Sequence, residues 1–417
     1  MPPSLALAVV TLGHALGSFA VLSVAPLSPY LVDALHLSRA QVGWLLPAAY
    51  LGGVLMSLPS GWLTDRLGVR LTLSFGLTVI GLMLAIATLS GTLAPLLVCL
   101  VLAGFGFSVL NPATGKAIVD WFPPRRRGAA MGVKQTGLTM GGVIASLVLP
   151  AVADDRGWRA ALWTAAAVAL GCAVLVALSY RAPPVVGVTR PAARPRLGEL
   201  SVYLRRPGVI VVFVCGFALS IVQSSLLAYL ALFAKETLSV SAIVAGQLLA
   251  LAQIGGTAGR LGWGFISDRY FGSRRRPGIV VNALFAAGAY LLFAFGARLP
   301  LAAFVPLAFV AGAGAFGWVG LYFALVAEIG GARHAGLLTG VSVMFAWSGV
   351  LVGPPLFGLL LEASGGYAVP WLTLVAVAAA VAIGLPRPQP LVQREPESSR
   401  LFARVADVSD DRAARTS

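Results

Sequence analysis

Residues 61–70 read GWLTDRLGVR, and a related stretch, GFISDRYFGSRR, recurs at 264–275 with one residue inserted before its second glycine. Each stretch joins two long apolar runs of the chain. Glycine lets neighbouring helices approach closely, so we expect Gly61 and Gly264 to lie at helix contacts. The later glycine in each stretch suits a tight turn. The motif therefore predicts two equivalent connections between helices, one in each part of the chain.

The apolar runs around the motif are long enough to cross a membrane. The 417 residues are 58 % hydrophobic and only 11 % charged, and the mean hydropathy is +0.89, which excludes an ordinary soluble domain. The alternating strands of a membrane barrel are absent. The predicted fold class is an all-α membrane protein with twelve transmembrane helices. Runs of about 20 or more apolar residues, the length that spans a bilayer, lie near 5–31, 41–63, 71–90, 94–119, 128–152, 158–180, 207–234, 241–266, 278–297, 300–326, 335–361 and 367–386.

The basic residues of the connections predict the orientation. Of the 30 Lys and Arg residues, 22 fall in connections on the side of residues 64–70, and five fall on the opposite side. Basic residues resist translocation, so we expect a multi-pass protein of the cell inner (plasma) membrane with both termini in the cytoplasm. Topology and contact with anionic lipid then explain the net charge of +15, and no nucleic-acid partner is expected.

Few residues suit catalysis or metal binding. The three cysteines all fall within apolar runs, and the three histidines lie on different segments. No disulfide framework, metal cluster or catalytic triad is therefore predicted. We expect neither an enzyme nor a cofactor or metal site.

The chain contains an internal repeat. A shift of 208 residues aligns Asp120, Arg125, Gly128 and Gly132 with Glu328, Arg333, Gly336 and Gly340, and a shift of 203 aligns the two copies of the opening motif. Many secondary transporters place their substrate site between two such repeats, near the bilayer midplane. The predicted domains are an N-terminal six-helix bundle (1–180), a cytoplasmic central loop (181–206), a C-terminal six-helix bundle (207–386) and a disordered cytoplasmic tail (387–417).

The duplicated motif, the twelve spans and the long central loop resemble the major facilitator superfamily over almost the whole chain to about residue 386. This resemblance implies two pseudo-symmetric bundles that rock about a central site and expose it to one side at a time. The motif residues are then expected to act in gating, because ties between helices would hold one face closed and break when it opens. Gly68 provides the turn of the first motif, and the other expected gating residues are Gly61, Asp65, Arg66, Gly264, Asp268 and Arg269.

Two basic side chains lie deep inside predicted spans. Arg260 precedes Asp268 by about 12 Å of helix and Lys134 follows Arg127 by about 10 Å, whereas Lys116 is close enough to a span end to reach the surface. A buried cation costs about 2.5–3.5 kcal/mol on insertion scales, which makes deep ones candidates for function. In the repeat, Arg260 aligns with a serine and so does Lys134, so neither charge is required by the duplicated fold.

A narrower resemblance concerns the eighth span. Gly259, Arg260, Gly264 and Asp268 are similar to the pattern of monocarboxylate and oxalate/formate transporters, in which that arginine binds a carboxylate, although Leu261 stands where those families usually have proline. The superfamily arrangement implies that Lys134 and Arg260 lie on opposite walls at similar depth. Helical spacing adds further residues to the predicted substrate site, namely Gln253 and Thr257 on the face of Arg260.

His14 is the remaining predicted site residue, and its role has two interpretations. As a titratable side chain inside the first span, it is suited to carry a proton or to donate a hydrogen bond to the substrate. A histidine that only packs against its neighbours is the alternative. The sequence alone leaves both open.

The predicted function is secondary active transport of a small organic anion, with a carboxylate as the expected group. The other expected partners are a coupled proton or counter-anion and the lipid bilayer, and we expect a monomer. A drug/proton antiporter is the main alternative, but no acidic residue lies deep in a span to relay protons, and the segment 128–142 lacks the Gly-Pro of the antiporter motif. A non-transporting membrane receptor is a more remote alternative.

Overall fold

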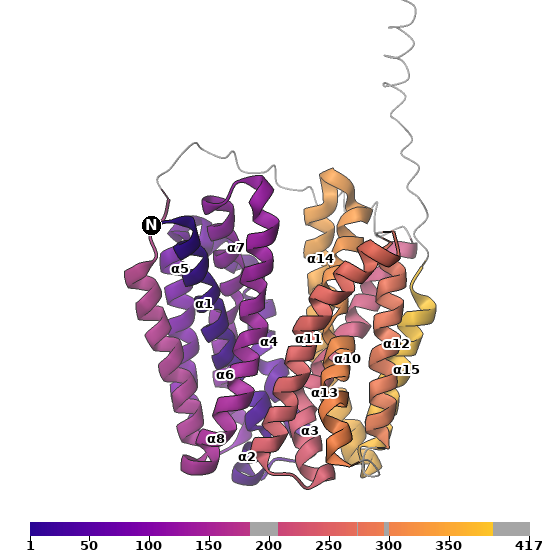
Figure 1. Cartoon of the computed structure of the whole chain (residues 1–417). Coiled ribbons are helices and arrows are strands. Elements are labelled where there is room, and N and C mark those ends of the chain that lie inside the picture. Colours follow the sequence, from indigo (N-terminus) through magenta and orange to yellow (C-terminus); the bar gives the residue numbers. More distant parts are fainter. Residues whose placement is uncertain (184–206, 273, 296–299, 387–417) are drawn as a thin grey trace, which may run out of the picture. The chain divides into compact units, whose positions relative to one another are not determined.

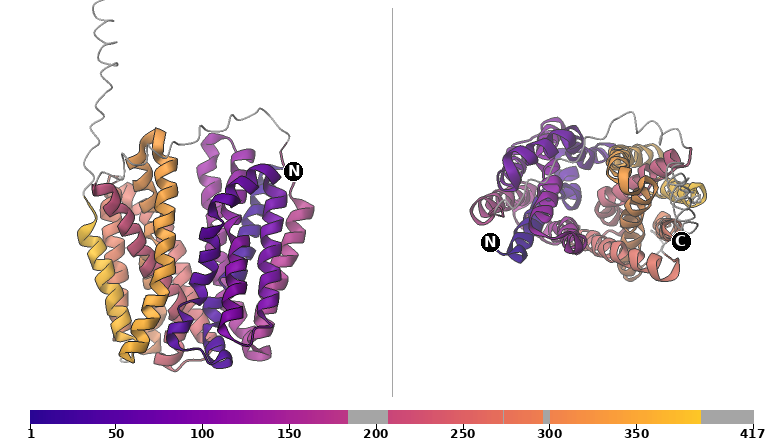
Figure 2. Two further views of the ribbon diagram at one scale, coloured as in Figure 1. Left: turned by 180° about the vertical axis from the view of Figure 1, so that it is seen from behind. Right: turned by 90° about the horizontal axis from the view of Figure 1, so that it is seen from above.

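The computed structural model describes residues 1–183, 207–272, 274–295 and 300–386, and these ranges contain helices and no strand (Figure 1). Met1–Pro386 forms one compact unit. Most of the predicted central loop, from residue 184, and the predicted disordered tail lie outside the described residues. We refer to residues 1–180 as the N-terminal half and to residues 207–386 as the C-terminal half. Figure 2 shows these halves side by side when seen from above.

The N-terminal half contains six predicted spans on eight helices. α5 and α8 each run through a tight turn between two spans, at Gly68 (φ 76°) and at Gly157 (φ 82°). Only glycine adopts such backbone angles without strain, which confirms the turn predicted at Gly68. The helices are α1 (Pro3–Val21), α2 (Val24–Leu35), α3 (Arg39–Val42), α4 (Leu45–Leu55), α5 (Ser57–Ala87), α6 (Leu93–Ser108), α7 (Leu110–Trp121) and α8 (Pro124–Ser179).

The C-terminal half repeats this plan. Gly272, the second-half counterpart of Gly68, also has a positive φ of 56°, and it lies two residues after the end of α11. The six predicted spans of this half again coincide with helices, and α14 contains parts of two of them. The helices are α10 (Pro207–Leu238), α11 (Ala242–Tyr270), α12 (Arg275–Ala294), α13 (Leu301–Phe316), α14 (Trp318–Ser364) and α15 (Ala368–Gly384).

Glycine allows the helices to pack at short range. The Cα of Gly104 on α6 lies 3.0 Å from the place where a Cβ on Gly52 of α4 would stand, and the reverse distance is also 3.0 Å. A Cβ on Gly259 of α11 would lie 2.9 Å from the Cα of Ala313 on α13. A larger residue at any of these positions would force the helices apart. Such close contacts suit a membrane protein, in which packing rather than the hydrophobic effect holds helices together.

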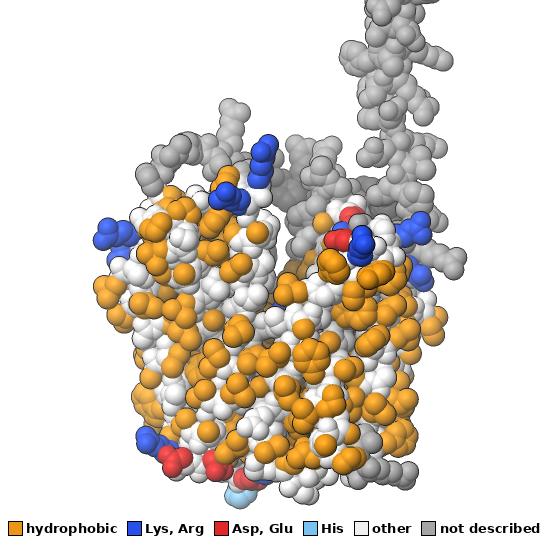
Figure 3. Space-filling model, viewed as in Figure 1, with side chains coloured by type: hydrophobic (Ala, Val, Ile, Leu, Met, Phe, Trp, Pro, Cys, Tyr) orange, Lys and Arg blue, Asp and Glu red, His pale blue; other side chains and the backbone are white. Residues whose placement is uncertain are grey.

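The two ends of the molecule differ in charge and in packing. One end, which we call the basic end, contains Arg125–Arg127 and the two motif turns, and the other, which we call the sealed end, contains the acidic residues Asp33, Asp154, Glu236 and Glu362. The halves are in contact at the sealed end, and Figure 3 shows the surface hollowed between them at the basic end. The structure therefore presents the space between the halves to the basic end.

Candidate substrate site and gates

Arg260 lies on α11 in the interior of the described protein. Its Nε is buried and has no hydrogen-bond partner among the described residues. The guanidinium carbon lies 5.8 Å from the centre of the Phe316 ring, a distance at which a cation and an aromatic face attract each other. An arginine with an unused buried donor is suited to receive an anionic ligand, because its planar fork matches a carboxylate at two points.

Aromatic residues from both halves gather beside this arginine. Tyr50 of α4 is near enough to Arg260 to interact with its charge. The Tyr50 ring makes edge contacts with Trp347 of α14, at 5.9 Å between ring centres, and with Phe107 of α6, at 6.0 Å. Arg260 and Trp347 come from the C-terminal half, whereas Tyr50 and Phe107 come from the N-terminal half. The arginine is thus close to the boundary between the halves.

Lys134 lies on α8 with only 4 % of its surface exposed. Its ammonium group donates to the side-chain oxygen of Asn111 on α7 (2.7 Å) and to that of Gln135 (2.9 Å). An ammonium group has three N–H donors, so these two neutral acceptors leave one donor and the full charge uncompensated. Lys134 therefore keeps an ionic interaction available for a ligand.

The contact between α8 and α11 allows the depths of Arg260 and Lys134 in the protein to be compared. Gln253 of α11 lies against Ser146 and Gly142 of α8, so it marks a common level on both helices. Arg260 lies seven residues beyond Gln253, and Lys134 lies eight residues beyond Gly142 and twelve beyond Ser146, all toward the basic end. At the helical rise these separations are about 10 Å for Arg260 and about 12–18 Å for Lys134. The cations are accordingly at similar depth on two helices that face each other across the boundary.

The predicted neighbours of Arg260 have other partners. Gln253 is 3 % exposed, and its amide donates to the hydroxyl oxygen of Ser146 in the opposite half (2.9 Å). The Thr257 hydroxyl donates to the backbone oxygen of Gln253 on its own helix (3.0 Å). In this conformation Gln253 ties the halves together beneath the site.

His14 lies on α1, apart from Arg260 and close to Lys134. The side chain is completely buried, and neither ring nitrogen has a hydrogen-bond partner among the described residues. A Cβ on Gly137 of α8 would lie 2.8 Å from the backbone oxygen of Thr11 and 3.5 Å from the Cβ of His14, so α8 packs directly on this face of α1. Gly137, one turn from Lys134, thus allows a tight helix contact.

The sealed end is held by ion pairs and hydrogen bonds between the halves. Arg39 pairs with Glu236 (3.2 Å) and Asp33 with Lys235 (2.7 Å). Glu362 accepts hydrogen bonds from the Ser38 hydroxyl (2.9 Å) and from the backbone N–H of Ala40 (3.1 Å). These bonds all join short N-terminal-half segments to α10 and α14. They would have to break if the sealed end opened.

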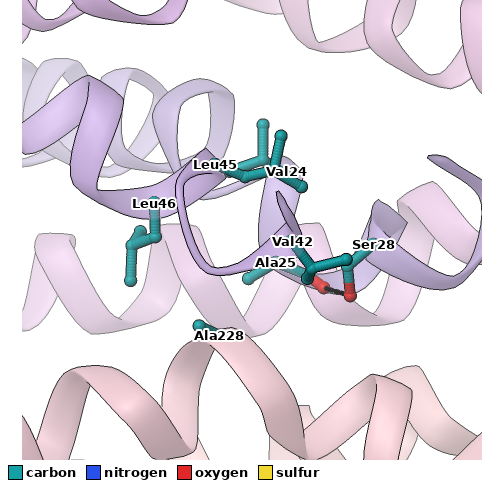
Figure 4. A pocket seen from close by; sticks show the side chains of 7 residues that line it. All are labelled: Val24, Ala25, Ser28, Val42, Leu45, Leu46 and Ala228. Carbon is teal, nitrogen blue, oxygen red and sulfur yellow. Dashed lines mark hydrogen bonds between the residues drawn. The ribbon is translucent and has the colours of Figure 1, made fainter. Parts of the chain in front are cut away.

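Apolar contact completes the seal. Figure 4 shows a small gap lined by α2, α3, α4 and, from the opposite half, by Ala228 of α10. Its single polar lining group, the Ser28 hydroxyl, donates to the backbone oxygen of Ala25 (2.8 Å). The gap offers a ligand neither a charge nor a free donor, so it belongs to the contact between the halves rather than to the substrate site.

The basic end carries a charge cluster in each half. On the N-terminal side, Lys116 lies between Asp65 (3.9 Å) and Asp120 (3.8 Å). On the C-terminal side, Arg275 lies between Asp268 (2.6 Å) and Glu328 (3.0 Å). The two acids of one cluster are the repeat counterparts of the two acids of the other, although the bridging cation comes from a different helix in each half.

Comparison with known proteins identifies the family. The model of the Major Facilitator Superfamily matches residues 7–350. The chain belongs to this superfamily. It is therefore a multi-pass membrane transporter by family and not an enzyme, as the sequence predicts.

Individual relatives give a range of roles within the superfamily. A hexuronate transporter of Bacillus subtilis is 24 % identical over 85 % of this chain and 88 % of its own length. The membrane sensor protein UhpC of Salmonella typhimurium is 27 % identical over 84 % of each chain. Among solved structures, a bacterial homologue of the human lysosomal transporter Spinster, described as inward-facing and unoccupied, has a TM-score of 0.75 at 22 % identity over 92 % of each chain, which confirms the fold.

Two expectations for the superfamily motif are wrong in this conformation. A Cβ on Gly61 or Gly264 would meet nothing within 4 Å, so neither glycine lies at a close helix contact. Both are at the basic end, where the halves are apart. Arg66 was expected to form a tie between helices, but its guanidinium lies 4.4 Å from the ring centre of Trp62 on its own helix. Arg269 is exposed and forms no ion pair with another described residue.

Several residues near the site were not singled out by the sequence. The sequence did not distinguish Tyr50, Trp347 and Ser146 from other residues, because aromatic and small polar residues occur in most of the spans. Asn111 is a polar residue inside an apolar run, and this signal could have indicated its bond to Lys134. Glu362 carried a weak signal, since it is an acidic residue directly after a long apolar run.

Proposed function

We propose that the protein is a secondary transporter for a small organic anion that bears a carboxylate, and that it works by alternating access in the cytoplasmic membrane with both termini in the cytoplasm. The observation that carries this proposal is the pair of deep cations at similar depth, Arg260 and Lys134, each with an unused donor. Transfer of a cation into a membrane interior is costly, and a bound anion offsets that cost. The hexuronate transporter among the relatives supports a carboxylate substrate.

The gates follow from the contrast between the two ends. The sealed end is closed by the contacts of Arg39, Lys235 and Glu362 with the opposite half, and the basic end is open. Reversal of this arrangement would bring the open surfaces around Gly61 and Gly264 together. The glycines of the motif would then provide the close helix approach that they do not show in the present conformation.

Drug/proton antiport is the first alternative. Every described Asp and Glu lies just beyond the end of a predicted span, so the described residues offer no deep carboxylate to attract a lipophilic cation. The two deep cations would repel such a substrate. Export of a lipophilic cation such as ethidium from cells that express the protein would favour this alternative over the anion transporter.

A membrane sensor is the second alternative, and the relative UhpC is the specific observation that favours it. A sensor would bind its ligand without moving it across the membrane. Counterflow in proteoliposomes separates the two functions. Vesicles preloaded with unlabelled glucuronate, lactate or oxalate are expected to take up the labelled acid faster than empty vesicles, because return of the empty, doubly cationic carrier is the costly step. Binding of a labelled acid without any uptake would instead support the sensor.

We expect Asp268→Asn to slow transport while it leaves substrate affinity close to that of the wild type. The substitution removes one of the two acids on Arg275, and the site lies far from Arg260 along α11. Partly exposed ion pairs are worth about 1 kcal/mol or less, so the transport rate should change by up to about fivefold. Asp65→Asn should act in the same direction but more weakly, because the Lys116 contact is longer.

Initial uptake rates and equilibrium binding, measured on the same preparations, check this prediction. A large loss of affinity with a normal rate at saturation would show that Asp268 acts in recognition rather than in gating.

A further inference from the structure

α1 presents three side chains on one face whose buried polar atoms have no partner among the described residues. Thr11, His14 and Ser18 are spaced by three and four residues, which places them on the same side of the helix. The Thr11 hydroxyl, both ring nitrogens of His14 and the Ser18 hydroxyl are buried and make no hydrogen bond to a described residue. Buried polar groups in proteins are almost always satisfied by protein, water or ligand. This face therefore has the properties of a site rather than of simple packing.

Lys134 is the charged group that acts on this face. It lies on α8 one turn before Gly137, which packs on His14, and its charge interacts with the imidazole. The helices packed against α1 are α5, α6, α7 and α8. Their buried titratable groups are the thiols of Cys99 and Cys172. Their other charged side chains lie toward the two ends of the molecule, and these are Asp65, Arg66, Arg70, Lys116, Asp120, Arg125, Arg126, Arg127, Asp154, Asp155, Arg156 and Arg159.

In this arrangement, protonation of His14 is coupled to the binding of an anion near Lys134. In the empty site, protonation of His14 would place a second positive charge beside that of Lys134, in a region from which water is largely excluded. A bound carboxylate near Lys134 removes this penalty, because its negative charge attracts both cations. Each ligand thus favours the binding of the other, as thermodynamic linkage requires.

We propose that His14 is the binding site of a co-transported proton, which enters and leaves together with the organic anion. This inference rests on the proposed function. The proton passes from hydronium to the unprotonated ring nitrogen of His14, so one O–H bond breaks as one N–H bond forms, and the reverse transfer returns it to water on the other side. The buried hydroxyls of Thr11 and Ser18 provide partners for water on the way to the ring. Transport of one proton with one monoanion is then electroneutral.

Proton movement in the wild-type protein is the first test. Proteoliposomes that contain the pH indicator pyranine are given an inward gradient of glucuronate, the probe chosen from the hexuronate relative. We expect internal acidification that accompanies glucuronate uptake, and accumulation of labelled glucuronate when the outside is more acidic than the inside. Glucuronate uptake without acidification would overturn the inference but leave the anion transporter intact.

His14→Gln is the second test, because glutamine keeps hydrogen-bonding groups but cannot be protonated in this range. The expected result is loss of accumulation driven by the proton gradient, together with counterflow that persists and no longer depends on pH. Leu12→Ala is the control on the exposed side of the same helix, and it should keep gradient-driven accumulation. Equal gradient-driven accumulation by the wild type and His14→Gln would overturn the assignment of His14.

The two hypotheses fail in different ways. Absence of counterflow by wild-type protein with glucuronate, lactate and oxalate would overturn the proposed function, and the proton site with it. Counterflow with no response to a proton gradient would overturn the proton site alone. Should His14→Gln not be recovered in folded form, the pyranine measurement on the wild type still decides between these outcomes.

Discussion

Arg260→Ala is expected to abolish high-affinity binding of the transported anion. The guanidinium has an unused buried donor and lies at the boundary between the halves, beside Tyr50. Loss of a two-point contact between arginine and carboxylate in such a site costs about 2.7 kcal/mol, which corresponds to an affinity reduced about 100-fold. Isothermal titration or a thermal-shift series with glucuronate, lactate and oxalate measures this change.

The lysine substitution separates charge from geometry. Arg260→Lys keeps a positive charge but loses the planar fork, so we expect an affinity between those of the wild type and Arg260→Ala. Lys116→Ala serves as the control, because it removes a cation from the basic end without change at the site. Wild-type affinity in Arg260→Ala would show that the arginine stabilises the fold and does not hold the substrate.

The fold was predictable because the bilayer restricts the structures that a membrane-spanning segment can form. A span needs about 20 apolar residues and must satisfy its own backbone hydrogen bonds, so the runs of the sequence mark the helices directly. The depth of Arg260 and of Lys134 followed from the same regularity, through the rise per residue. The pairing of α8 with α11 then supports the similar depth that the sequence analysis inferred from the family resemblance.

Contacts between distant segments were not predictable in this way. The bonds from Glu362 to Ser38 and Ala40 depend on how α14 meets a short N-terminal-half helix, and no local pattern encodes that meeting. Tyr50 and Trp347 could not be distinguished from the many aromatic residues of other spans. The expectation for Gly61 and Gly264 was wrong for a different reason, because the proposed alternating access requires two conformations of one sequence and the structure shows one.

Gly246→Val should shift the protein out of the conformation described, and this change is expected to be large. A Cβ at Gly246 would lie 2.5 Å from the backbone oxygen of Ser146 and 2.7 Å from Pro150, both on α8 of the opposite half. A backbone oxygen cannot rotate away, so the sealed end would have to separate. Overpacking costs of about 1–3 kcal/mol shift a two-state equilibrium about fivefold to 160-fold toward the conformation that is open at the sealed end.

Gly264→Val provides the matched control, because it makes the same substitution on the same helix at a position where nothing lies within 4 Å. It should leave the present conformation undisturbed and obstruct closure of the basic end. Both variants are expected to transport poorly, but for opposite reasons. The difference appears in the accessibility of Ala228, which is 4 % exposed and contributes to the seal from α10.

This difference is measured by labelling Ala228→Cys in a background without the three native cysteines. The reagent is a maleimide that cannot cross the membrane, and it is added on the side of the sealed end. The rate should rise about tenfold in Gly246→Val and should not rise above that of the parent in Gly264→Val. Since the two valines have the same helix propensity and lie on one helix, a general loss of stability would raise labelling in both. Faster labelling in Gly246→Val alone would mean that the packed glycine holds the seal. Equal rates in all three proteins would contradict the assignment of this contact as a gate.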